Sequence, residues 1–191
     1  MATGDANYPE YWTPDGAAIL FIKDDGRSLY RLPLSGSRRP ELLLETPFPK
    51  DEFRVSPDGR WIAFNSLESG QWEVYAASFP TFADKRQVSR GGGAQPLWRN
   101  DGKELFYLSL QGKLMAIDTK LGASFEASDP ASLFQAPIRV NPLIDQYAVA
   151  RDGQRFIFCA PGHSAGQQPI TVVVNWTAGF NVSQGTTRGP H

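Results

Sequence analysis

Ser56-Pro-Asp-Gly59, followed by the apolar run Trp61–Phe64, is the stretch of sequence that decides the fold. In such a turn Pro sets the backbone angle of the second residue, Asp accepts nearby backbone N–H groups, and Gly adopts the left-handed conformation. The same turn recurs as Thr13-Pro-Asp-Gly16, Ser56-Pro-Asp-Gly59, Arg99-Asn-Asp-Gly102 and Ala150-Arg-Asp-Gly153. The turn glycines lie 43, 43 and 51 residues apart. This near-constant spacing predicts a repeated structural unit.

Short runs typical of β-strands surround each turn, because they are rich in aromatic and β-branched residues and bounded by Gly, Pro, Asp or Ser. The runs before the turns are Tyr8–Trp12, Glu52–Val55, Gln95–Trp98 and Gln146–Val149. The runs after them are Ala17–Ile22, Trp61–Phe64, Glu104–Leu108 and Arg155–Ala160. Third runs are Ser28–Leu34, Gln71–Phe79, Lys113–Asp118 and Ile170–Trp176. Fourth runs, which are missing or weak in the last unit, are Pro40–Glu45, Arg86–Ser89 and Ser132–Gln135.

Antiparallel four-stranded units of about 43 residues have the repeat length of propeller blades. We therefore predict an all-β fold, a β-propeller segment of about four four-stranded antiparallel blades. The expected blades span about 8–46, 51–90, 94–136 and 145–182 within a single partial propeller domain, 1–182. Residues 183–191 are expected to form a flexible tail.

Composition narrows the classes of partner. The 191-residue chain has a formal net charge of -1, whereas a nucleic-acid partner normally requires a basic excess. No stretch approaches the ~20 apolar residues that span a bilayer, so we expect no membrane insertion. No signal-peptide pattern precedes the repeats. The single cysteine, Cys159, lies in an apolar run and is expected to be a buried, inert thiol.

The second unit carries a family resemblance. Ser56-Pro-Asp-Gly-Arg-Trp-Ile-Ala-Phe64, followed by Glu73-Val-Tyr75, is similar to the repeat of TolB-like β-propellers. The ending Pro169-Ile-Thr-Val-Val-Val-Asn-Trp176 resembles the C-terminal propeller of bacterial Ser/Thr kinase sensor proteins. The resemblance implies a non-catalytic recognition, sensor or protein-interaction module, often extracytoplasmic or periplasmic. No kinase motif occurs in the chain.

An arc of four blades has an uncovered apolar face at each end, whereas propellers of this family usually have six or seven blades. If each face offers about 500 Å² of apolar surface, covering it is worth on the order of 12 kcal/mol before association costs. We therefore predict a homodimer in which two chains close one ring. A compressed four-bladed monomer is the alternative.

The mouth of the central channel is the expected binding site, for a protein or a small-molecule ligand. Alignment on the turn glycines brings together the predicted ligand-binding residues Glu10, Asp51, Glu52, Gln95, Asp145 and Gln146. Carboxylate and amide oxygens suit Ca²⁺, with Asp51, Glu52 and Asp145 as candidate metal ligands. Polar lining of a wet channel is the alternative.

A second function class remains open, that of a hydrolase acting on esters or lactones. Its site would be the channel mouth or Ser164 with His163 in Gly162-His-Ser-Ala-Gly166, a match to the G-x-S-x-G motif. The helix that follows the serine in esterases is absent from the pattern, which favours a hairpin loop. Trp12 and Trp98 share one repeat position, which predicts a repeated core role.

Overall fold

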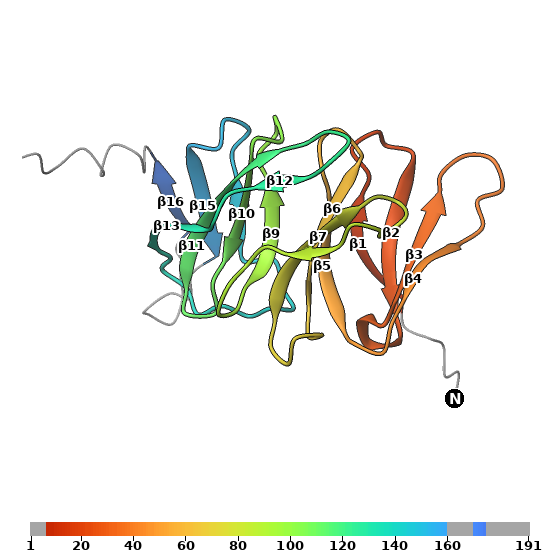
Figure 1. Ribbon diagram of the computed structural model, residues 1–191, viewed down its shortest axis with the longest axis horizontal. Coiled ribbons are helices and arrows are strands. Elements are labelled where there is room, and N and C mark those ends of the chain that lie inside the picture. Colours follow the sequence, from red (N-terminus) through yellow and green to blue (C-terminus); the bar gives the residue numbers. More distant parts are fainter. Residues whose placement is uncertain (1–6, 160–169, 175–191) are drawn as a thin grey trace, which may run out of the picture.

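The computed structural model describes residues 7–159 and 170–174. These residues form 16 β-strands and one short 3-10 turn, η1 (Asp24–Gly26), with no α-helix among them. The strands make four antiparallel sheets that follow one another in chain order, as Figure 1 shows. The predicted fold class, an all-β propeller segment, is confirmed. None of the helical segments in the described part of the chain is long and apolar enough to cross a membrane.

The four sheets are called blades 1 to 4. Blade 1 contains β1 (Tyr8–Trp12), β2 (Ala18–Lys23), β3 (Ser28–Pro33) and β4 (Glu41–Glu45). Blade 2 contains β5 (Lys50–Val55), β6 (Trp61–Ser66), β7 (Glu73–Ser78) and β8 (Arg86–Gln87). Blade 3 contains β9 (Ala94–Trp98), β10 (Glu104–Leu108), β11 (Lys113–Lys120), β12 (Glu126–Ala127) and β13 (Ala131–Gln135). Blade 4 contains β14 (Tyr147–Val149), β15 (Arg155–Cys159) and β16 (Ile170–Val174).

The strand number per blade differs from the predicted four in two places. In blade 3 both β12 and β13 pair with β11, because the chain after β11 returns along the same edge twice. The described part of blade 4 has three strands. The sequence pattern had already shown no strong fourth run in this unit.

The Asp-Gly turns adopt the geometry that their residues favour. All four glycines have positive φ angles between 69° and 73°. In each turn the glycine N–H donates to the carbonyl three residues earlier, as Gly59 does to Ser56 at 2.9 Å. The Asp carboxylate accepts a hydrogen bond from the backbone N–H two residues later, as Asp58 does from Arg60 at 3.1 Å. The repeated turn therefore fixes the same hairpin between the first two strands of every blade.

Consecutive blades pack with a constant polarity. The leading face of a blade, which holds the residues two and four places after the turn glycine, faces the next blade. The trailing face, which holds the residues three and five places after it, faces the preceding blade. The three cores thus join Leu20 with Ile62 and Phe64, Ala63 with Leu105 and Tyr107, and Phe106 with Phe156 and Phe158.

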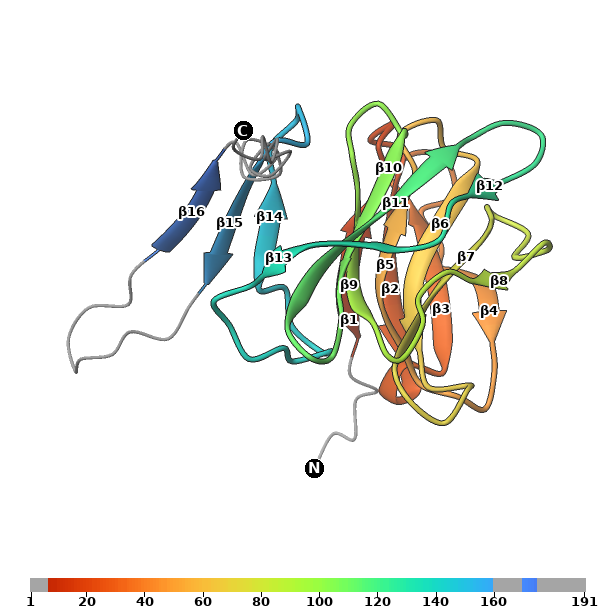
Figure 2. The same ribbon diagram turned by 60° about the vertical axis from the view of Figure 1, so that its left-hand side comes forward.

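Within the described residues 7–159 and 170–174, blades 1 and 4 each have one face without a neighbouring blade. Figure 2 shows blade 4 at one end of the arc and blade 1 toward the other. On the trailing face of blade 1, Trp12 is 60% exposed and Leu42 is 50% exposed, whereas on the leading face of blade 4 Ile157 is 46% exposed. Cys159 is also exposed, so the prediction of a buried thiol was wrong. The sequence places it in an apolar strand, but its side of that strand has no described blade against it.

The prediction of a shared core role for two tryptophans holds for only one of them. Trp98 lies in the core between blades 2 and 3 and is 9% exposed, because blade 2 covers it. Trp12 occupies the same repeat position in blade 1 and is 60% exposed, because no described blade precedes blade 1.

Candidate functional site

Bulges in the inner strands bring the predicted acidic residues together. Each of β1, β5 and β9 has one more residue than the stretch of β2, β6 or β10 opposite it. The extra backbone bends the strand locally. At these bulges Glu52 and Gln95 have φ angles of 58° and 57°. Glu10 is the extra residue of β1, between Pro9 and Tyr11.

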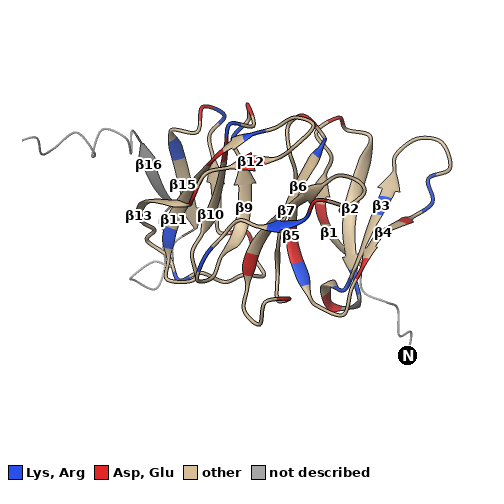
Figure 3. Ribbon diagram, viewed as in Figure 1, with Lys and Arg blue, Asp and Glu red and all other residues tan. Residues whose placement is uncertain are grey.

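Glu10, Asp51 and Glu52 meet around one backbone donor. The Glu52 N–H donates to Glu10 Oε2 at 3.0 Å and to Asp51 Oδ1 at 2.8 Å. Blades 1 and 2 are therefore joined at the inner edge by a polar contact as well as by their apolar core. Figure 3 shows the acidic and basic residues of β5 next to the acidic residue of β1.

Arg54 links this cluster to blade 4. Its guanidinium is bonded to the Glu52 carboxylate at 2.9 Å and forms a second ion pair with Asp145. It also donates to the carbonyl of Phe53 at 2.9 Å. The Arg54 side chain is 8% exposed and that of Asp145 is 63% exposed, so the network runs from the interior to the surface. With its bond to the Glu10 carbonyl at 3.4 Å, Arg54 contacts residues of blades 1 and 2 and the segment that leads into blade 4.

Burial raises the pKa of the carboxyl groups in this cluster. It raises the pKa of Glu52 to about 9, with Asp145 adding to the shift and Arg54 opposing it. Burial and the neighbouring Asp51 raise the pKa of Glu10 to about 8, and burial raises the pKa of Asp51 as well. Burial thus favours the protonated form of these carboxyls, whereas Arg54 favours the ionised form of Glu10 and Glu52.

Gln95 and Gln146 form a separate amide pair between blades 3 and 4. The Gln95 Nε2 donates to Gln146 Oε1 at 2.9 Å, and the Gln146 N–H donates to Gln95 Oε1 at 2.8 Å. The Tyr147 hydroxyl donates to the Gln95 carbonyl at 2.9 Å. The bonds made by these amides are internal, so in this arrangement the pair stabilises the interface between blades.

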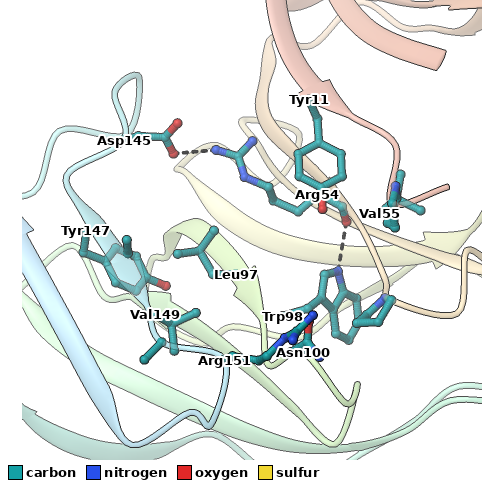
Figure 4. A pocket seen from close by; sticks show the side chains of 14 residues that line it. Tyr11, Arg54, Val55, Leu97, Trp98, Asn100, Asp145, Tyr147, Val149 and Arg151 are labelled. Atoms are coloured by element: carbon teal, nitrogen blue, oxygen red, sulfur yellow. Dashed lines mark hydrogen bonds and ion pairs between the residues drawn. The ribbon is translucent and has the colours of Figure 1, made fainter. Parts of the chain in front are cut away.

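A cleft of about 650 Å³, lined by described residues of all four blades, lies at the turn side of the inner strands. The second residue of each Asp-Gly turn lies at this cleft, namely Pro14, Pro57, Asn100 and Arg151. Figure 4 shows Arg54 extended between Tyr11 and Asp145, with Trp98 beneath it and Tyr147 on the blade 4 side. The Trp98 Nε1 donates to the Arg54 carbonyl at 2.9 Å. Apolar walls with a few convergent polar groups are typical of binding pockets.

The predicted residues are divided between this cleft and the opposite end of the inner strands. Asp145 lines the turn-side cleft. Glu10 and Asp51 line a second cavity of about 470 Å³, together with Trp72 and Leu143. Glu52 and Gln95 are buried between the two, at 4% and 1% exposed. Within residues 7–159 and 170–174, no group of three or more His, Cys, Asp or Glu residues is arranged to hold a metal ion. Ser164 and His163 lie outside the described residues.

Sequence reasoning missed Arg54, which is the centre of the network. A signal was present, because Arg54 is a charged residue in the short inner strand between Phe53 and Val55. A charge in such a strand requires a buried partner. The cleft residues Tyr11, Asn100 and Arg151 carried no comparable signal.

The sequence of this chain has little similarity to known families and proteins. No family model matches the chain. An uncharacterized protein, Atu1656, of Agrobacterium fabrum is 33% identical over 79 residues, which are 36% of this chain and 25% of that protein.

The solved structures that resemble this fold include TolB proteins. A protein assigned as TolB from Agrobacterium tumefaciens matches with a TM-score of 0.67 and 22% identity over 90% of this chain and 59% of its own. TolB from Acinetobacter baumannii matches with a TM-score of 0.59 and 15% identity over 90% of this chain and 44% of its own. A protein assigned as a 6-phosphogluconolactonase from Bacteroides uniformis matches with a TM-score of 0.54 and 15% identity, over 89% of this chain and 55% of its own. The fold is therefore that of a TolB-like β-propeller, and the chain spans about half the length of these structures. The resemblance to kinase sensor propellers stays a prediction.

Proposed function

We propose that this chain is a non-catalytic recognition module that binds a peptide segment of a partner protein in the turn-side cleft. The observation that carries the proposal is the convergence of the four Asp-Gly turns around a single cleft of about 650 Å³. Apolar side chains such as Leu97 and Val149 form part of its walls, and Arg54 and Asp145 supply charge at fixed positions. Apolar contact area with a few oriented polar groups suits a peptide with an apolar side chain and a free polar end.

The interior carboxyls support binding rather than chemistry. Glu52 is 4% exposed, and it is bonded to Arg54 at 2.9 Å. A general acid or base must reach a proton on the substrate, and the internal bonds of Glu52 hold it away from the cleft surface. The same bonds make the floor of the cleft rigid, and a preorganised surface reduces the cost of binding.

Selection from a random peptide library displayed on phage tests the proposal. Peptides selected on the wild-type chain are expected to bind at least about tenfold more weakly to Asn100→Trp, which fills the cleft, and to Arg151→Glu, which reverses a charge at its rim. Arg139→Glu is the matched control, because Arg139 is exposed and does not line the cleft. Failure to select any peptide, or equal binding to all three variants, contradicts the proposal.

The proposal has two further parts. The first is that a second copy of the chain is the partner that closes the ring, and the second is that the protein has an extracytoplasmic or periplasmic location. The apolar side chains on the outer faces of blades 1 and 4 support the first point. The second rests on the TolB-like resemblance, and cell fractionation with compartment markers tests it.

A hydrolase is the second candidate function, because one similar structure is assigned as a lactonase and the chain contains the Gly162-His-Ser-Ala-Gly166 motif. Assays with p-nitrophenyl esters and a δ-lactone test this candidate. Turnover lost in Ser164→Ala favours a nucleophilic serine, whereas turnover lost with EDTA favours a metal site at Asp51, Glu52 and Asp145. Calcium in the channel mouth is tested separately, by calorimetric titration with Ca²⁺.

A further inference from the structure

We propose that two copies of this chain associate head-to-tail, with the leading face of blade 4 in one copy packed on the trailing face of blade 1 in the other. The inference rests on the proposed role of a second copy. Beyond that role, the inference specifies which two faces meet, in which orientation they meet, and which residues lie at the contact.

The three blade interfaces within the chain supply the geometry. In each of them a leading face packs on a trailing face, and no two faces of the same kind meet among the described blades. Between blades 3 and 4 the ring of Phe106, four places after its turn glycine, contacts the ring of Phe156, three places after the next one, with centroids 5.1 Å apart. At the free ends the equivalent positions are Ile157 in blade 4 and Ile19 in blade 1. The repeat therefore pairs Ile157 with Ile19 of the second copy.

The two tryptophans at the same repeat position show what is missing at the free end of blade 1. Trp98 is covered by blade 2, and its Nε1 donates to the carbonyl of Arg54, five places before the turn glycine of blade 2. Trp12 has the same place in blade 1 and is 60% exposed. The residue equivalent to Arg54 in blade 4 is Ala148, which is exposed. A second copy would thus offer the Ala148 carbonyl to the Trp12 indole.

The free face of blade 4 likewise lacks the neighbouring blade that covers the equivalent residues elsewhere in the chain. Six places after the turn glycine, Ile22, Asn65 and Leu108 are 6%, 0% and 0% exposed, because the next blade covers them. At this position in blade 4 is Cys159, which is exposed. Ile157 and Cys159 thus occupy positions that are buried in blades 1 to 3, where the repeat continues.

A second copy is the occupant that these surfaces fit, because the two free faces of one chain are repeats of the two sides of an existing interface. Each copy supplies one leading and one trailing face. A closed pair therefore buries both faces of both copies, by two equivalent contacts related by a twofold axis. Exposed apolar side chains such as Trp12, Leu42 and Ile157 on these faces are typical of an interaction surface.

Sedimentation equilibrium of the full chain at 1 to 50 µM tests the pairing. The expected mass is twice 21.1 kDa for the wild type. Ile157→Glu is expected to weaken the pair at least about 100-fold, because a charge would be buried without a partner. Ile144→Glu is the matched control, since Ile144 is 52% exposed and lies in the loop before β14, outside the strands of both end faces. A monomeric wild type, a mass above two copies, or an unchanged pair in Ile157→Glu overturns the proposal.

Disulfide trapping in a Cys159→Ser background tests the polarity. The double variant Ile19→Cys with Ile157→Cys, or an equal mixture of the two single variants, is expected to give covalent dimers under mild oxidation. Each single variant alone is expected to stay uncrosslinked. Crosslinking of a single variant alone shows that like faces meet, and overturns the head-to-tail arrangement. Because both experiments measure assembly and not peptide binding, their failure is distinguishable from failure of the cleft proposal.

Discussion

Blades 2 and 4 start from the same Asp-Gly turn, yet their second strands differ in burial. All six residues of β6 in blade 2 are buried, whereas β15 in blade 4 alternates between exposed and buried residues. Blade 2 has a neighbour on both faces and blade 4 has a described neighbour on one. The difference teaches that burial in this fold is set by the number of adjacent blades, and that an end blade is an interior blade with one face uncovered.

The largest expected effect contrasts an interior with an end position. Phe64→Ala is expected to lower the free energy of unfolding by about 3 to 5 kcal/mol, because a fully buried ring leaves a cavity. Phe64 is 0% exposed and its ring stacks on that of Phe53 at 5.2 Å. Ile157→Ala, measured at protein concentrations too low for pairing, is expected to change it by about 0.5 kcal/mol or less. Urea denaturation measures both, and equal losses would contradict the contrast between the blades.

A smaller effect is expected at the paired tryptophan positions. Trp98→Phe is expected to cost about 1 to 3 kcal/mol, since it removes the hydrogen bond to the Arg54 carbonyl and part of the core volume. Trp12→Phe is expected to cost about 0.5 kcal/mol or less in the dilute chain. The same denaturation series measures both. A costly Trp12→Phe at low concentration would mean that blade 1 is already covered in the single chain.

The third prediction concerns pH. Per pH unit, the expected change in the free energy of unfolding is smaller than the loss expected for Phe64→Ala, and it arises at the junction of blades 1, 2 and 4. Burial raises the pKa of Glu52 from the ordinary 4.5 to about 9. Above pH ~4.5 the unfolded chain loses this proton while the folded protein keeps it, so the free energy of unfolding falls as pH rises toward about 9. The slope due to Glu52 is at most about 1.4 kcal/mol per pH unit.

Glu52→Gln, which cannot ionise, is expected to reduce the slope of this profile between pH 5 and 9 without abolishing it, because Glu10 also has a pKa raised to about 8. The exposed Glu126→Gln is the control and is expected to retain the full slope. Thermal unfolding followed by circular dichroism across this range measures the slopes. A wild-type stability that rises with pH would show that Glu52 is ionised in the folded protein.

The sequence predicted the repeat, the turns and the strands because these depend on local chemistry. Gly59 and its three equivalents adopt the left-handed conformation that the turn requires, and the Asp side chain before each of them caps the turn. The contrast between Trp12 and Trp98 could not be predicted in this way. The two residues have the same local context, and only the presence of a preceding blade separates them.

The sequence predicted that Glu10, Asp51 and Glu52 lie near one another, but it did not predict Arg54 at their centre, and their role in ligand binding stays a prediction. Alignment on the turn glycines correctly brought Glu10, Asp51 and Glu52 to one region. Their arrangement around Arg54 depends on bulges in β1 and β5, where Glu52 adopts a φ of 58°. Glu has no intrinsic preference for that conformation, so sequence alone gives no signal for it. The pairing of strands and the burial of Arg54 together impose it.

The reaction of Cys159 with a thiol reagent is the most direct test of the claim that the end faces are uncovered interior faces. The account predicts that Cys159 reacts rapidly when the chain is dilute, and at least about tenfold more slowly at concentrations where pairing covers the leading face of blade 4. Ile157→Glu should restore the rapid rate. A rate that is the same at all concentrations, with wild type and variant alike, would contradict the account.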